Sequence, residues 1–157
     1  MKLLSLTVLC LLSWASFSQS APEAEVKATI QQFFKGFHQQ DSVLMLSAVS
    51  KEIKMQSVGK QQDGSSSLTT TNFDTFLKSI LAIPATQSFE EKILNYNIQV
   101  DGNMAHAWTP YQFWFGGSLH HCGVNSFQLY KTNDIPDGKE GTWNIIYVVD
   151  TRHNDCE

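Results

Sequence analysis

The stretch AWTPYQFWFGGSLHHCGVNSFQLYK, residues 107–131, predicts two long strands joined by a tight turn. Its two halves are rich in aromatic residues and alternate from one side chain to the next, as half-buried strands do. Gly116-Gly117 stands between the halves, and glycines supply the positive φ angles that such a turn requires. We therefore predict a β-hairpin with strands at 103–115 and 118–131.

The sequence extends this hairpin into a meander on both sides. Upstream, Lys92 to Val100 alternates, and Asp101-Gly102 after it is the strongest short-range signal for a hairpin. Downstream, a loop from Thr132 to Gly141 leads to a last strand from Thr142 to Arg152. The second half of the chain thus predicts a four-stranded antiparallel sheet.

The first half of the chain has mostly helical periodicity. Asp41 is placed to cap a short second helix, and Thr71-Asn72-Phe73-Asp74 resembles the capping box of a third. Lys51 to Val58 alternates like a strand, whereas Gly59 to Thr71 is polar and typical of a loop or of a lid over a pocket. We predict an α+β fold, with three N-terminal helices packed on a curved antiparallel sheet. The apolar face of the first helix consists of Val26, Ile30, Phe33, Phe34 and Phe37.

Residues 1–18 have the pattern of a secretory signal peptide. Lys2 precedes an apolar run from Leu3 to Trp14, and small residues suited to a leader peptidase follow it. Cleavage before Gln19 would leave a single domain, residues 19–157. We predict an exported protein, periplasmic or secreted, without stable membrane insertion after cleavage.

The charge balance excludes one large class of partner. The 157 residues carry 11 Lys and Arg against 15 Asp and Glu, and the loss of Lys2 would change the net charge from −4 to −5. Nucleic-acid binding needs clustered basic residues, so we expect no nucleic-acid partner. No cofactor is expected either.

Two cysteines remain after cleavage, because Cys10 lies inside the predicted signal peptide. An even pair in an oxidising compartment predicts a disulfide between Cys122 and Cys156. If the last two strands pair around their loop, Cys122 lies opposite roughly residue 152. The C-terminal tail must then fold back for Cys156 to reach it.

The order helix, helix, strand, helix and four-strand meander resembles the nuclear transport factor 2-like (SnoaL-like) superfamily. Three strand motifs, AWTPYQFWFGG, HCGVNSFQL and WNIIYVVDTR, resemble its exported bacterial branch that is labelled lumazine-binding. The resemblance implies a cone-shaped, cystatin-like α+β fold with a cavity between the long helix and the concave sheet. It implies no reaction, because the superfamily includes isomerases, dehydratases and polyketide cyclases beside members without known activity.

Strand alternation assigns the side chains of the hairpin to an inner and an outer face. His121 and Asn125 fall on the inner face with the core residues. Pro110 removes a ladder donor and favours a bulge, so Trp108 and Tyr111 both remain as wall residues. The predicted ligand-binding residues are Phe33, Phe34, Phe37, Trp108, Tyr111, His121, Asn125 and Phe127.

The favoured function is the binding of an unidentified small, partly aromatic or apolar molecule in the cavity. The first alternative is a cavity enzyme, in which His121 handles a proton near neutral pH, Tyr111 donates a hydrogen bond and Asp150 orients them. In the simpler interpretation, Asp150 and Arg152 form a near-surface ion pair and His121 only lines the wall. The second alternative is an interaction module, a homodimer through the convex face of the sheet.

The spacing of the two histidines and the cysteine in HHC argues against a metal site. On a regular strand His120 and Cys122 point together and His121 cannot join them, so a zinc ion would need His153 or Cys156 from the tail. We expect no metal. A disulfide-bonded Cys122 would also be no nucleophile.

Overall fold

The computed structural model describes residues 20–132 and 141–156, and the predicted signal peptide at 1–18 lies outside them. These residues form three helices: α1 (Ala21–Gln39), α2 (Ser42–Leu46) and α3 (Phe73–Leu81). They also form seven strands: β1 (Val49–Lys60), β2 (Ser66–Thr71), β3 (Phe89–Ile93), β4 (Asn97–Asp101), β5 (Met104–Phe115), β6 (Ser118–Lys131) and β7 (Trp143–Thr151). All seven strands join one sheet, so the chain is of the α+β class.

The helices begin at capping residues that the sequence contains. The backbone N–H of Ser20 donates to the Glu23 carboxylate at 3.2 Å, and Asp41 accepts a hydrogen bond from the backbone of α2. Asn72, rather than Thr71, caps α3 with its side-chain oxygen. Within the described ranges, no helix has the length and apolarity to cross a membrane.

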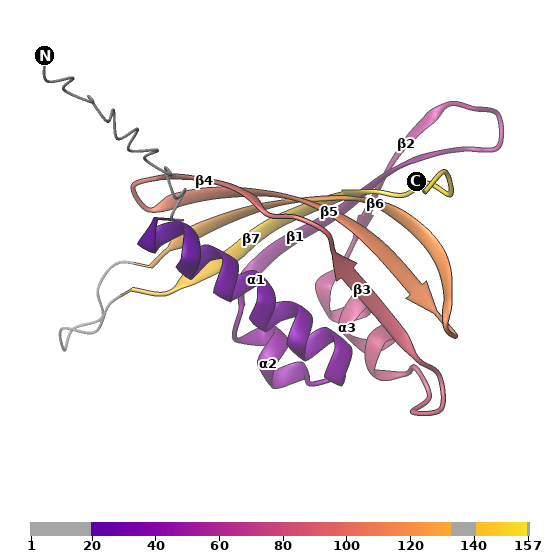
Figure 1. Ribbon diagram of the computed structural model, residues 1–157, viewed down its shortest axis with the longest axis horizontal. Helices are drawn as coiled ribbons and strands as arrows, with labels where there is room; N and C mark the ends of the chain where they lie inside the picture. Colours follow the sequence, from indigo (N-terminus) through magenta and orange to yellow (C-terminus); the bar gives the residue numbers. More distant parts are fainter. Residues whose placement is uncertain (1–19, 133–140, 157) are drawn as a thin grey trace, which may run out of the picture.

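The sheet is mixed, which corrects the prediction of an antiparallel sheet. Its strand order is β2-β1-β7-β6-β5-β3, and β4 pairs with β5 beyond the end of β3. β1 and β7 run parallel, while the other pairs are antiparallel. In a meander alone β7 would be an edge with unpaired backbone groups, and β1 satisfies these groups. The helices also do not all precede the sheet, since α3 follows the hairpin of β1 and β2 (Figure 1).

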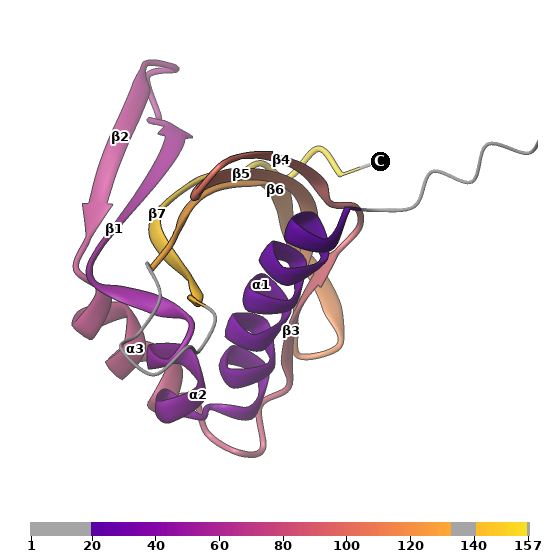
Figure 2. The same cartoon turned by 90° about the vertical axis from the view of Figure 1, so that its left-hand side faces the viewer.

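The sheet arches over α1, and the core lies in the hollow between them (Figure 2). Phe34 of α1 meets Phe127 of β6 edge to face, with ring centroids 6.2 Å apart. The apolar stripe of α1 that the sequence predicts is buried along its whole length. Its partners on the inner face of the sheet include Ala105, Ala107, Phe127, Leu129 and Ile145.

Part of the stretch predicted to be a loop, Gly59 to Thr71, is a β-hairpin. β2 pairs with the second half of β1 from Met55–Thr71 to Lys60–Ser66, and Gly64 in the turn has a φ of +83°. Serine and threonine give β2 no alternation of apolar and polar residues, so the pairing leaves no pattern in the sequence. The hairpin extends past the rest of the sheet (Figure 1).

The strand predicted from Lys92 to Val100 is divided between β3 and β4. β3 pairs with Tyr111–Phe115 and β4 with Met104–Trp108, so both lie along the same edge of β5. Pro110 lies opposite the break, where its carbonyl accepts a hydrogen bond of 2.8 Å from the Leu94 N–H. Proline has no N–H to give to a ladder, and the sheet accommodates it by interrupting the edge strand instead of bulging β5.

The predicted disulfide between Cys122 and Cys156 is confirmed, with their Cα atoms 5.7 Å apart. The tail folds back after an isolated bridge that pairs Cys122 with His153. A regular ladder between β6 and β7 predicts roughly residue 152 opposite Cys122, whereas His153 lies there. The shift of one residue arises from a bulge between Ile145 and Tyr147 in β7.

Removing this disulfide should lower the free energy of unfolding by about 3–4 kcal/mol in the chain-entropy model. The reason is that the bond closes a loop of 34 residues in the unfolded chain. Urea denaturation of the Cys122→Ser/Cys156→Ser protein beside the wild type measures the change. Equal stability, or peptide mapping of the oxidised wild type that finds both thiols free, would contradict the assignment.

Candidate functional site

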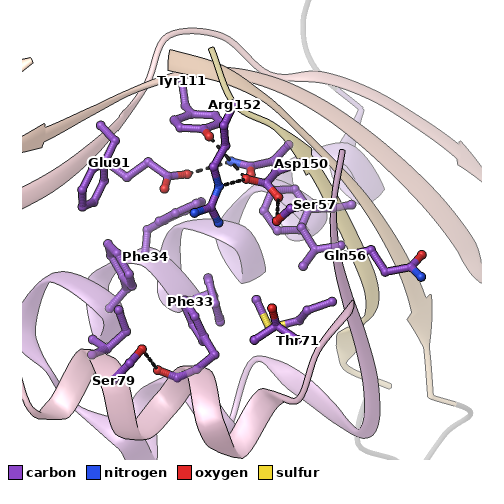
Figure 3. Close-up of a pocket in the computed structure, with 18 of the residues that line it drawn as sticks. Phe33, Phe34, Gln56, Ser57, Thr71, Ser79, Glu91, Tyr111, Asp150 and Arg152 are labelled. Atoms are coloured by element: carbon purple, nitrogen blue, oxygen red, sulfur yellow. Dashed lines mark hydrogen bonds and ion pairs between the residues drawn. The ribbon is translucent and has the colours of Figure 1, made fainter. Parts of the chain in front are cut away.

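A cavity of about 360 Å³ opens between α1, α3 and the inner face of the sheet. This volume is near the lower end of the range of small-molecule sites. Figure 3 shows phenylalanine rings along its walls and a group of polar side chains at the end under the sheet. The lining comprises Phe33, Phe34, Phe37, Met55, Gln56, Ser57, Thr71, Thr75, Phe76, Ser79, Ile80, Glu91, Tyr111, Phe113, His121, Asn125, Phe127, Val148, Asp150 and Arg152.

The apolar wall is held rigid by contacts between its own rings. Phe34 and Phe37 meet edge to face with centroids 6.1 Å apart, and Phe37 stacks on Phe76 of α3 at the same distance. These contacts join α1 to α3 across one side of the cavity. The wall therefore offers flat apolar surface without large loss of side-chain entropy on binding.

Asp150 is the centre of the polar end of the cavity, a group that also includes Ser57, Glu91, Tyr111, Asn125 and Arg152. It lies in register with Ser57 of β1 on one side and with Asn125 of β6 on the other. Its carboxylate accepts hydrogen bonds from the Ser57 hydroxyl, from the Tyr111 hydroxyl at 3.4 Å and from Arg152 Nε at 2.7 Å. Since these donors satisfy both oxygens, the buried charge is tolerated.

Glu91 of β3 brings a second carboxyl group to this polar end. Its Oε1 accepts a hydrogen bond of 2.7 Å from the Asn125 amide, and its backbone N–H donates to Nε2 of His38 on α1 at 3.0 Å. Burial raises the pKa of Glu91 to about 7, with Asp150 adding to the rise and Asn125 opposing it. Glu91 is therefore a group that exchanges a proton near neutral pH.

His121 lines the cavity, but its pKa lies below the near-neutral value on which the predicted catalytic role rests, and that role stays a prediction. Its ring lies 4.9 Å from that of Phe113, and burial, with Arg152 and His120 nearby, lowers its pKa to about 4. The ring is therefore neutral at pH 7. A bulge in β6 also turns His120 beside it, with the two Nδ1 atoms 2.9 Å apart, instead of to the opposite face.

Tyr111 lies in the cavity wall with its hydroxyl already engaged. The hydroxyl donates to the Thr151 carbonyl at 3.0 Å, besides its longer contact with Asp150. Burial raises the pKa of Tyr111, and the carboxylates of Glu91 and Asp150 raise it further. Gly123 faces the ring across the sheet, where a Cβ would overlap the Thr151 carbonyl oxygen. The neutral Tyr111 side chain thus links β5 to the end of β7 through its hydrogen bond.

The sequence comparisons give no relative, whereas the fold has many. The chain matches no protein-family model and no curated protein sequence. A Nostoc punctiforme PCC 73102 protein with a cystatin-like fold superposes with a TM-score of 0.63, 13% identity and coverage of 87% of this chain and 95% of that one. An NTF2-like protein of Shewanella baltica OS155 superposes with a TM-score of 0.57 and 14% identity, over 88% of this chain and 100% of that one. A ketosteroid isomerase-like protein of Shewanella frigidimarina NCIMB 400 superposes with a TM-score of 0.55 and 11% identity, over 80% of this chain and 94% of that one.

The chain has the NTF2-like, cystatin-like fold. At such low identities the likeness shows the fold alone. The function of the chain must be argued from its own cavity.

Seven of the eight predicted ligand-binding residues line the cavity: Phe33, Phe34, Phe37, Tyr111, His121, Asn125 and Phe127. Their contact with a ligand stays a prediction. The prediction for Trp108 is wrong, because this residue lies on the outer face of β5, is 47% exposed and does not line the cavity. No bulge occurs at Pro110, so the alternation of β5 continues unbroken past it. Trp108 lies instead on the convex face with exposed Met104 and Tyr130, where a homodimer contact stays a prediction.

Sequence reasoning missed Glu91 and did not place Arg152 in the cavity. Glu91 alternates with Phe89 and Ile93 on the inner face of β3. A carboxylate between two apolar residues of an alternating strand is the signal that would have found it. The predicted near-surface ion pair of Asp150 and Arg152 is present, with 58% of the Arg152 side chain exposed, but the sequence does not indicate that the pair also lines the cavity.

The pKa of Glu91 should make the stability of the protein depend on pH. Between its ordinary value of 4.5 and about 7 the folded state keeps a proton that the unfolded state has lost. The contribution of Glu91 to stability therefore falls as pH rises through this window, by on the order of 2–3 kcal/mol. The lowered pKa values of His121 and His38 act in the opposite direction and are shared by the wild type and Glu91→Gln. Urea denaturation at pH 5 and pH 8 should therefore show that the stability of the wild type relative to Glu91→Gln falls by this amount.

Glu90→Gln is the matched control for this experiment, because Glu90 is the exposed neighbour on the same strand and pairs with Lys92 at 3.7 Å. It should keep the wild-type pH dependence. Equal pH profiles for the wild type and Glu91→Gln would show that Glu91 does not titrate as described.

Proposed function

We propose that the protein binds a small molecule in the cavity between α1, α3 and the concave sheet. The observation that carries this proposal is the asymmetry of the cavity. One side is formed by rings such as Phe34 and Phe76, and one end by hydrogen-bonding groups such as Glu91 and Arg152. Apolar surface with a few convergent polar groups is what small-molecule sites consist of.

The setting of this activity is proposed to be outside the cytoplasm, in the periplasm or the surrounding medium. The signal-peptide pattern of residues 1–18 supports export, and the disulfide between Cys122 and Cys156 is compatible with it. Membership of the exported branch labelled lumazine-binding stays a prediction from the three strand motifs.

Filling the cavity should abolish binding. Ser79 lines the cavity from α3, whereas its neighbour Lys78 is exposed and does not line it. Native mass spectrometry of protein purified from its own host should find a retained small molecule in the wild type and in Lys78→Trp, and little in Ser79→Trp. A wild type without retained molecule, or equal retention by Ser79→Trp, would contradict the proposal.

Proton-transfer catalysis is the second candidate function, and the position of Glu91 favours it. A carboxyl group that titrates near pH 7 beside a cavity is suited to take and return a proton. In this version Glu91 replaces His121 as the base, since His121 is the weaker base. Arg152 would stabilise negative charge on a substrate oxygen.

This candidate predicts exchange of carbon-bound hydrogen in a carbonyl ligand. With a retained ligand of that kind in deuterated water, the wild type and Glu90→Gln should catalyse exchange next to the carbonyl, followed by NMR. Glu91→Gln should slow it by about 10²–10⁴-fold, the contribution of a positioned base. Undiminished exchange in Glu91→Gln would remove Glu91 from the reaction.

A further inference from the structure

Arg152 is the single arginine of the sequence, and it lies in the cavity wall. Its Nε donates to Asp150 at 2.7 Å, which fixes the direction of the side chain. Its two terminal amino groups have no hydrogen-bond partner in residues 20–132 and 141–156, and Figure 3 shows them directed into the cavity. With 58% of the side chain exposed, these donors are open to a ligand.

Glu91 places a second free polar group beside them. Asn125 occupies one carboxyl oxygen of Glu91, and the other oxygen has no partner among the described residues. When Glu91 is protonated this oxygen is a donor, so it adds to the two donors of Arg152. The donors at this end are then in excess, because both oxygens of Asp150 already accept hydrogen bonds.

The charges around Glu91 decide which ligand it accepts. Burial lowers the pKa of His38 and also that of His121, and burial raises that of Tyr111, so these three groups are neutral near pH 7. Glu90 and Lys92 pair with each other at 3.7 Å on the exposed side of β3. The negative charge of Asp150 and the positive charge of Arg152 cancel, so the polar end has no net charge whenever Glu91 holds its proton. The titratable groups that act on the Glu91 carboxyl are Asp150 and Arg152 at the end of the sheet and Tyr111 of β5. His38 of α1 contacts the Glu91 backbone, and His121 of β6 lines the same cavity.

We infer that the ligand is an amphipathic carboxylic acid, bound with its carboxylate on the terminal amino groups of Arg152 and on protonated Glu91. The two amino groups match the two oxygens of a carboxylate. The apolar body lies against Phe34 and Phe76, toward α3. This inference rests on the proposed binding function and adds the chemical class of its ligand.

Binding of such an anion is coupled to the proton on Glu91. If only the protonated form binds, affinity is nearly constant below pH 7 and falls about tenfold per pH unit above it. Between pH 6 and pH 8.5 the loss is about 30-fold for a group with a pKa near 7. The carboxylate of the ligand is ionised throughout this range, so the change reports Glu91.

Calorimetric titration with aryl and alkyl carboxylates of graded size, each beside its primary amide, tests the inference. At pH 6 the wild type should bind at least one carboxylate about tenfold or more tightly than its amide, and lose this affinity at pH 8.5. Glu91→Gln, which keeps a neutral donor, should bind that carboxylate equally at both pH values. Arg152→Gln should lose the preference over the amide, and Glu90→Gln should behave as the wild type.

The outcomes separate this inference from the proposed function. Carboxylates bound no better than amides, or the same pH dependence in Glu91→Gln as in the wild type, would overturn the inference. If amides bind and Ser79→Trp abolishes their binding, the cavity site stands and the acid specificity is wrong. Failure of every carboxylate to bind also overturns the inference. In that case the retained-ligand measurement by native mass spectrometry is the remaining test of the proposed binding function.

Discussion

The buried carboxylate of Asp150 is the constraint on which the candidate site depends. A charge in this position needs several donors, and the sheet supplies them from β1, β5 and the end of β7. The parallel pairing of β1 with β7 sets Ser57 opposite Asp150, and the antiparallel pairing of β6 sets Asn125 on its other side. Asn125 in turn holds Glu91 of β3. One polar row thus crosses the inner face of the sheet and ends at the cavity.

The same row shows how the last strand and the first helix are both fixed at the cavity. β7 ends at Thr151, and the chain continues through Arg152 to His153, which pairs with Cys122 before the tail reaches the disulfide. At the other side, the backbone of Glu91 donates to His38, so the N-terminal helix is fixed to β3 at the height of the cavity. The groups proposed to bind the ligand are therefore positioned by backbone pairing and a covalent bond rather than by mobile loops.

The sequence predicts the interior well where apolar and polar residues recur with the period of a strand or helix, and poorly where they do not. The hairpin at residues 103–131, the stripe of α1 and the inner position of Asn125 follow from period and turn chemistry. The parallel contact of β1 with β7 joins residues about a hundred positions apart, and no local pattern encodes it. β2 was missed because its serines and threonines have no apolar face. Trp108 was misplaced because the effect of Pro110 falls on the edge strand instead of on β5.

The proposed ligand is a small acid that occupies this cavity with its charge on Arg152. A crystal structure of the protein with its tightest-binding carboxylate would show whether it does. The carboxylate oxygens of the ligand should lie within hydrogen-bond distance of the terminal amino groups of Arg152 and of Glu91, with the apolar body against Phe34. A ligand bound elsewhere, or reversed with its carboxylate toward α3, would contradict it.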